Sequence, residues 1–236
     1  MPVAKSAYNI KSTIPMSNPK SVLIRIEPTD LAITLREIYS SLSNLCWVYN
    51  MPNVGRMYKM SLQKRADRTI AKLKDELKLA PDSSLSTSAG EYIISELAHS
   101  TVVNDLGYLD IPLAELIKQK VTGNPGFDFF AENPTKSIVL FGEAKYSSTT
   151  NAYDRAFKQI LDFVEKDGKD IMDMADLEHL CTEQAQENMA NGQKGFIAAF
   201  SSTRMSDNTL KSHIENHEQY KALLKYEEVV CVAVTI

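Results

Sequence analysis

An α/β fold with a central sheet flanked by helices is the class that the sequence predicts. Two short, mostly apolar runs, 126–132 and 137–147, are separated by a turn sequence, NPTK, and this predicts two adjacent strands. Downstream, helical patterns alternate with two more apolar runs, at 195–202 and 227–236. Strand–helix–strand crossovers of this kind are typical of sheets that carry helices on their faces.

Composition narrows the class of protein further. The chain has 236 residues and a formal net charge of −4, so a basic signature for nucleic acid is absent from the chain as a whole, although a local basic groove stays open. No stretch approaches the length of a membrane span and the N-terminus lacks the apolar middle of a signal peptide, so we expect a cytoplasmic protein without a membrane partner. Three distant cysteines without a CxxC pair indicate reduced thiols.

Residues 1–85 are expected to form an N-terminal region that is mostly helical and that could bind a partner. The first 20 residues are polar and predict an arm or an irregular start. A short strand is expected over 21–27, and a helix is expected over 28–49 with Thr29 or Asp30 as its N-cap.

A second helix of this region is expected over 61–80, ending before Pro81. It interleaves basic residues with apolar ones, which indicates a solvated outer face, the interpretation that we favour. The alternative is a contact surface for a DNA backbone. The basic residues are Lys64, Arg65, Arg68, Lys72 and Lys74.

A second domain is expected over 86–236, with the polar sequence PDSSLSTS (81–88) marking the boundary. Its first helix is expected over 88–100. The segment 116–122 is compatible with a strand or with a helix end. Further helices are expected over 151–169, 174–192 and 206–225.

Charged residues on the two central strands are the feature that predicts chemistry. Side chains alternate across a strand, so Glu143 and Lys145 are expected to point the same way, and Asp128 on the preceding strand can reach the same edge of the sheet. The run from Ile138 to Phe141 is apolar enough to be covered on both sides. A covered acid and lysine need a reason, and we therefore favour a functional site over a solvent-facing pair.

Two neighbouring carboxylates suit a hard divalent cation. We expect Asp128 and Glu143 to hold Mg²⁺, with the backbone carbonyl of Ala144 as a further ligand and with Mn²⁺ able to substitute. Such a metal polarises a phosphate and lowers the pKa of a bound water. Lys145 could orient or deprotonate that water, or stabilise the developing charge on phosphorus. Hydrolysis of a phosphodiester needs these parts.

The order Asp128, fourteen residues, then Glu143-Ala144-Lys145 resembles the PD-(D/E)XK nuclease superfamily. The resemblance covers roughly residues 88–203. It implies a restriction-endonuclease-like core, which is a central mixed sheet flanked by helices, and Mg²⁺-dependent cleavage of DNA. The family's first helix often carries another acid, and Glu91 fits that place as a catalytic or metal-binding residue. The residue before Asp128 is Phe127 where the family's motif has proline.

A narrower resemblance is to the HamA component of Hachiman antiphage systems. It rests on a Gly-Glu pair that opens an apolar helix, then GFD, then GEAKYSS before an alanine-containing helix. It implies a nuclease effector of a defence complex that works with a helicase partner, a HamB-like protein. The chain has no GxxxxGK[ST] phosphate loop, so ATP use would belong to that partner.

Other interpretations stay open beside these. Ser88 and Glu91 match the capping box, so Glu91 could serve only as a helix cap. Glu96 could replace Glu91 but would point to a different side of the helix. The chain could be a restriction-type enzyme that acts alone, or a catalytically silent nuclease fold that binds a partner. A different α/β enzyme is disfavoured because no dinucleotide turn, nucleophile elbow or zinc pattern is present.

Overall fold

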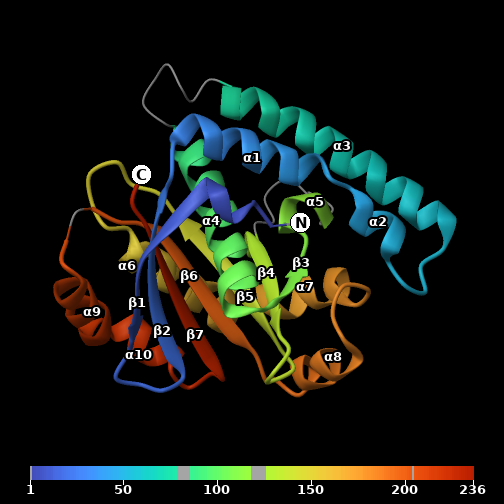
Figure 1. Cartoon of the computed structure of the whole chain (residues 1–236). Helices are drawn as coiled ribbons and strands as arrows, with labels where there is room; N and C mark the ends of the chain where they lie inside the picture. The colour runs from blue at the N-terminus through green and yellow to red at the C-terminus, as the bar shows by residue number, and fades with distance from the viewer. Residues whose placement is uncertain (1, 79–85, 118–125, 204) are drawn as a thin grey trace.

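A mixed sheet of seven strands forms the centre of the computed structural model, which describes residues 2–78, 86–117, 126–203 and 205–236 (Figure 1). The strand order is β1-β2-β7-β6-β5-β4-β3. The four central strands, β2, β7, β6 and β5, run parallel to one another. Strands β1, β4 and β3 pair antiparallel with their neighbours. The strands are β1 (Tyr8–Pro15), β2 (Ser21–Pro28), β3 (Leu109–Ile111), β4 (Phe129–Asn133), β5 (Ile138–Lys145), β6 (Gly195–Ser201) and β7 (Glu228–Val234).

Helices cover both faces of the sheet, so the chain has the α/β class that the sequence predicted. On one face α4 contacts β4 to β7, and α1 and α3 pack outside it; on the other face α6 lies against β5 and β6 (Figure 1). The helices are α1 (Leu31–Ser43), α2 (Cys46–Asn50), α3 (Arg56–Lys78), α4 (Thr87–Leu106), α5 (Ala114–Ile117), α6 (Tyr153–Asp162), α7 (Lys169–Leu177), α8 (Glu183–Ala190), α9 (Asp207–Asn216) and α10 (Glu218–Leu223). No helix in the described part of the chain combines the length and apolarity that crossing a bilayer requires.

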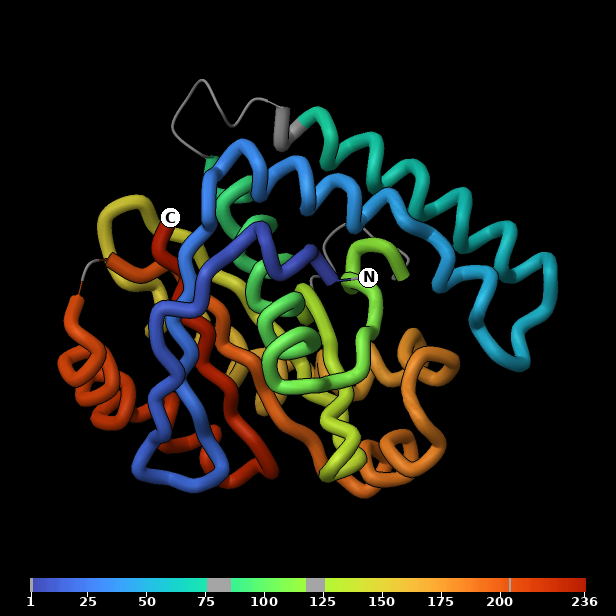
Figure 2. Tube along the Cα trace, in the orientation of Figure 1, coloured from blue at the N-terminus to red at the C-terminus, as the bar shows by residue number. Residues whose placement is uncertain are grey.

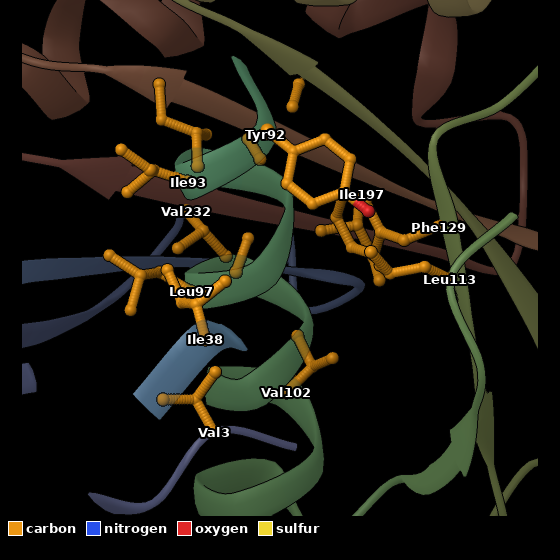
Figure 3. Close-up of a cluster of buried hydrophobic side chains, with 14 of the residues drawn as sticks. Val3, Ile38, Tyr92, Ile93, Leu97, Val102, Leu113, Phe129, Ile197 and Val232 are labelled. Carbon is orange, nitrogen blue, oxygen red and sulfur yellow. The ribbon is translucent and has the colours of Figure 1, made fainter. Parts of the chain in front are cut away.

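The helix α4 is buried along most of its length. Its side chains meet side chains from the sheet and from α1, as Figure 3 shows for Leu97, Val232 and Ile38. The helix begins after Ser86, whose hydroxyl accepts a hydrogen bond from the amide of Ala89 at 3.2 Å. The expected capping box starting at Ser88 is therefore wrong, because Ser88 already lies inside the helix. Burial on all sides makes α4 a fixed support for the residues that it carries.

The start of the chain is not the irregular arm that its polar composition predicted. After a short 3₁₀ turn at Lys5–Ala7, β1 and β2 form an antiparallel hairpin, and β2 then pairs in parallel with β7 (Figure 2). Strand β1 includes several polar residues because most of its side chains face solvent at the edge of the sheet. The sheet therefore takes strands from both sides of the expected boundary at 81–88, of which residues 81–85 lie outside the described residues.

Three of the expected helices are each divided in two. The helix expected over 28–49 breaks at Asn44, between α1 and α2. The segment expected as one helix over 174–192 breaks after α7, because the backbone amide and hydroxyl of Thr182 donate to the buried carboxylate of Glu132 at 2.9 and 2.6 Å. Thr182 then caps α8. The helix expected over 206–225 breaks at His217, which has extended backbone geometry between α9 and α10.

Smaller differences concern where elements begin and end. Asp30, not Thr29, caps α1, and α3 starts at Arg56, earlier than expected. The helix expected over 151–169 is α6 followed by a π-helical turn, and it ends at Gly168. Strand β3 was not expected. Of the ambiguous segment 116–122, Leu116 and Ile117 belong to α5 and the rest lies outside the described residues.

Candidate active site

At the open end of the β4–β5 hairpin, away from its turn, Asp128 and Glu143 lie opposite each other. Phe129 pairs with Gly142 in the antiparallel ladder, and just before β4 the amide of Asp128 donates to the carbonyl of Gly142 at 2.9 Å. Gly142 is needed here, because a Cβ at this position would lie 2.5 Å from the ring of Phe129. The local sequence thus fixes the register that places the acid on one strand beside the acid on the other.

Hydrogen bonds hold the acidic residues and the lysine together. The Oδ2 atom of Asp128 accepts from the amide of Ala144 at 2.8 Å. The ammonium of Lys145 donates to Oε1 of Glu143 at 2.5 Å and to the carbonyl of Ala144 at 3.1 Å. Glu143 and Lys145 share a face, as strand alternation predicted. Glu143 is only 2% exposed, and its Oε2 atom has no hydrogen-bond partner among the described residues.

The electrostatics of this cluster favour an added positive charge. Burial raises the pKa of the Asp128 carboxyl to about 6, against the opposing effects of the Lys145 ammonium and the Ala144 amide. Burial, and next the neighbouring Asp128 carboxylate, raise the pKa of Glu143 well above its usual range. Burial alone would lower the pKa of Lys145, but the carboxylates of Glu143 and Asp128 raise it. Two poorly solvated carboxylates share one ammonium, so a cation would stabilise their charged forms.

Glu91 reaches this cluster from α4. Its Oε1 atom lies 3.9 Å from the ammonium of Lys145, and its side chain is 30% exposed. The preceding Gly90 explains the approach, because the ring of Tyr146 lies where a Cβ of residue 90 would be, with ring carbons 2.3 to 2.7 Å from that point. Tyr146 follows Lys145 and packs against the opposite side of the sheet, with the core around α4. A glycine thus lets α4 lie against the end of β5.

Two hollows open beside Glu91. One, of about 270 Å³, is bordered by Asp128, Glu91 and Lys72 of α3, together with residues of α4 and α5. The other, of about 480 Å³, is bordered by Glu91 and Lys145 on one side and by α6 on the other. Its residues from α6 include Arg155, Lys158 and Gln159.

Arg155 and Lys158 were not singled out in the sequence analysis. A signal was available, since α6 directly follows the β5 strand that carries Glu143 and Lys145. Polar residues on the exposed side of such a helix can face the same end of the sheet. The hydrogen bond from the Arg155 guanidinium to the carbonyl of Tyr146, at 2.6 Å, ties this helix to the end of β5.

The residues present fit a magnesium ion that completes its shell with water. Within the described residues, no three His, Cys, Asp or Glu side chains are gathered as a metal cage. Magnesium, however, is usually held by one or two carboxylates, several waters and substrate phosphates. Asp128, Glu143 and the carbonyl of Ala144 supply oxygens, and the unpartnered Oε2 of Glu143 is a buried acceptor. The Lys145 ammonium contacts Glu143 and Ala144, so it has to release them when a cation is bound.

Glu96, the alternative to Glu91, lies outside this cluster. It is 2% exposed and borders a small cavity with His99, Trp47 and Leu113, and its Oε2 atom has no hydrogen-bond partner among the described residues. Burial raises the pKa of Glu96 to about 8. The sequence expectation that Glu96 would point to a different side of α4 agrees with this position.

Glu96→Gln is expected to stabilise the protein at alkaline pH. In the unfolded chain Glu96 ionises near its ordinary pKa of about 4.5, whereas in the fold it stays neutral to about 8. The folded protein thus binds the extra proton, and its free energy of unfolding falls as pH rises through this window. Glutamine stays neutral, so the variant should gain on the order of a few kcal/mol over the wild type at pH 9 and little at pH 4.

Urea unfolding across this pH range measures the effect. Glu187→Gln, at an exposed position of α8, is the matched control and should keep the pH dependence of the wild type. Equal pH dependence in wild type and Glu96→Gln would contradict the prediction.

No protein-family model matches the chain, and no curated protein matches its sequence.

Proposed function

We propose that the chain is a metal-dependent nuclease that hydrolyses phosphodiester bonds of DNA at the cluster of Asp128, Glu143 and Lys145. The observation that carries the proposal is the buried Glu143 carboxylate, which lies against Lys145 with one oxygen unpartnered among the described residues. A buried acceptor without a partner costs roughly 1–3 kcal/mol, and a cation held by this oxygen would offset that cost. A site that binds a cation explains this arrangement.

The fold is compatible with the proposal. A buried helix, α4, precedes the three antiparallel strands β3, β4 and β5, and α6 then leads to β6, which runs parallel to β5. This is the order of elements that the resemblance to PD-(D/E)XK nucleases implied. We therefore propose a restriction-endonuclease-like core for this part of the chain.

Each residue has a role in the proposed reaction. Asp128, Glu143 and the Ala144 carbonyl would hold Mg²⁺, which supplies charge stabilisation to a phosphate and a more acidic water. The amide of Ala144 orients Asp128 through the hydrogen bond at 2.8 Å. Lys145, once it has left Glu143, brings its ammonium to the attacking water or to the phosphate oxygens. Glu91 faces the same ammonium at 3.9 Å and would limit where it moves.

Lys145→Ala is expected to abolish DNA cleavage while leaving the fold intact. The measurement is conversion of supercoiled plasmid to nicked or linear forms in Mg²⁺, with EDTA as the metal control. Loss of at least about 100-fold in rate is expected, since a positioned proton donor or acceptor contributes this much or more. Lys136→Ala is the matched control, because this lysine is also paired with a glutamate, Glu228, at 3.3 Å but lies in the turn before β5, at the opposite end of that strand from Lys145.

Wild-type activity in Lys145→Ala would overturn the proposed mechanism. Absence of cutting by the wild type, alone and with a helicase partner, would favour the silent binding module. Cutting by the wild type that no helicase changes would favour the restriction-type enzyme that acts alone.

We further propose that the nuclease is the effector of an antiphage defence complex with a helicase partner. The support is the resemblance of the Gly-Glu, GFD and GEAKYSS segments to the HamA family. Co-purification with a helicase encoded beside it is the test, and faster, ATP-dependent cleavage in the joint complex is the expected result. Failure of every such helicase to bind or to change cleavage would remove this part and leave the nuclease proposal standing.

A further inference from the structure

The helix α3 carries a concentration of positive charge that the rest of the chain lacks. Between Arg56 and Lys78 it has eight Lys or Arg residues and three Asp or Glu residues, which gives a net charge of +5. The whole chain has a net charge of −4, so the residues outside α3 carry −9. A surface that opposes the charge of the rest of the chain in this way is typical of a binding surface for polyanions.

Four of the eight basic residues lie on one side of α3. A basic stripe, defined as Lys64, Arg65, Arg68 and Lys72, recurs at spacings of three and four residues and therefore follows one face of the helix. The opposite side of α3 packs into the core. Its buried residues are Leu62, Ala66, Ile70 and Leu73.

Lys74 does not belong to the stripe. Its ammonium lies over the ring of Tyr39 in α1, 5.0 Å from the ring centroid, so Lys74 helps to attach α3 to α1. Lys64, Arg68 and Lys72 are exposed, and Figure 1 shows α3 on the outside of the molecule alongside α1. One side of α3 thus carries the basic stripe, and another side attaches the helix to α1.

The stripe leads into the candidate active site. Lys72, at its C-terminal end, borders the same hollow as Asp128 and Glu91. Beside it, the hydroxyl of Thr69 donates to the backbone carbonyl of Glu115 at 3.3 Å, and Glu115 borders this hollow as well. This contact holds the stripe at a fixed place next to Asp128.

The length of the stripe suits a nucleic-acid backbone. From Lys64 to Lys72 the helix rises about 12 Å, at 1.5 Å per residue. One strand of a duplex carries a phosphate every 3.4 Å along its axis, so this length faces roughly three or four phosphates. A strand that enters the hollow at Asp128 can therefore continue along α3 with its phosphates beside the stripe.

We propose that α3 is a docking surface for the phosphate backbone of the DNA substrate and guides the strand to the site at Asp128 and Glu143. This rests on the proposed nuclease function, because the direction of the strand is set by that site. The contacts are to phosphates, so they contribute affinity without sequence preference. An acidic face of a protein partner is the other polyanion that could cover this helix.

Lys64→Gln/Arg68→Gln tests the proposal without touching the cluster at Glu143. Binding of a fluorescein-labelled 20-base-pair duplex is followed by anisotropy in EDTA, so that no cleavage occurs. Each phosphate contact contributes about 0.9 to the slope of log affinity against log salt concentration. We expect the double variant to bind at least tenfold more weakly at 50 mM salt, with a slope smaller by about 2. Glutamine is a good helix former, so α3 should stay folded.

Lys11→Gln/Lys221→Gln is the matched control, with the same charge change at two exposed lysines on β1 and α10. It should leave the salt slope nearly unchanged. Equal binding by wild type and the α3 variant would overturn the proposal, and so would absence of DNA binding by the wild type. An acidic protein partner would then remain as the occupant of the stripe.

The binding assay separates this proposal from that of the nuclease itself. Lys145→Ala should bind the duplex as the wild type does and fail to cut it. The α3 variant should still cut plasmid when DNA is saturating. Unchanged binding in the α3 variant, together with loss of cutting in Lys145→Ala, would overturn only the docking surface. Weakened binding without any cutting by the wild type would overturn only the nuclease.

Discussion

Glu143→Gln should eliminate the response of the protein to Mg²⁺ and reduce DNA cleavage by roughly three orders of magnitude. Glutamine keeps the shape of the side chain but removes the charge that attracts a divalent cation. A metal contributes several kcal/mol to the stabilisation of transition-state charge, and each 1.4 kcal/mol is a factor of ten in rate. The side chain is buried beside Lys145, in the centre of the cluster.

Two measurements check this expectation. A ligand at 100 times its Kd raises the free energy of unfolding by about 2.7 kcal/mol, so Mg²⁺ should raise the wild-type Tm and leave that of Glu143→Gln unchanged. Glu132→Gln is the matched control, because Glu132 is a buried carboxylate on the neighbouring strand that binds Thr182. The control should lose stability and keep its Mg²⁺ response. A full Mg²⁺ response in Glu143→Gln would show that the metal binds elsewhere.

Gly90→Ala should destabilise the protein and lower its activity, against the usual trend for helices. Alanine in a helix interior is normally favoured over glycine by about 1 kcal/mol. Here the new methyl group would lie 2.3 to 2.7 Å from ring carbons of Tyr146, at the root of that ring, so the ring or α4 has to move. Overpacking of this kind costs about 1–3 kcal/mol. Displacement of α4 also moves Glu91 away from Lys145, and cleavage should fall at least tenfold.

A mutant cycle shows whether the contact with Tyr146 is responsible. Adding Tyr146→Ala makes room for the methyl group, so the double variant should be less destabilised than the sum of the two single variants. Gly55→Ala is the control for glycine replacement itself, because a Cβ at that position meets no atom within 4 Å. Additive losses of stability in Gly90→Ala and Tyr146→Ala would contradict the explanation. Urea unfolding and plasmid cleavage supply the two readouts.

The parts of the site that lie close together in sequence were predictable. Alternation along β5 placed Glu143 and Lys145 on one face, and the short turn to β4 placed Asp128 opposite them. These are local consequences of strand geometry, which a single sequence carries. The α/β class followed in the same way, from the alternation of strand and helix patterns.

Features that depend on distant partners were not predictable. Ser86 and Ser88 are both good caps, and a local pattern favoured Ser88 because Glu91 follows it at the right spacing. The start of α4 is instead at Ser86, which leaves Glu91 inside the helix and near Lys145. The break before α8 likewise depends on Glu132, a residue 50 positions earlier. The role of Lys72 beside Asp128 depends on how α3 packs against α5.

Because β2 pairs with β7, the sheet is completed only after the last strand of the chain has been synthesised. Ser21 lies beside Val229 in this ladder, and β7 separates the β1–β2 hairpin from β6. A nascent chain therefore has the residues of the candidate site long before the strand that joins the two parts of its sheet. Contacts so distant in sequence form late and slowly. A ribosome-bound intermediate would thus hold Asp128 and Glu143 on an unfinished sheet, and the supported site would appear only after residue 234 has been made.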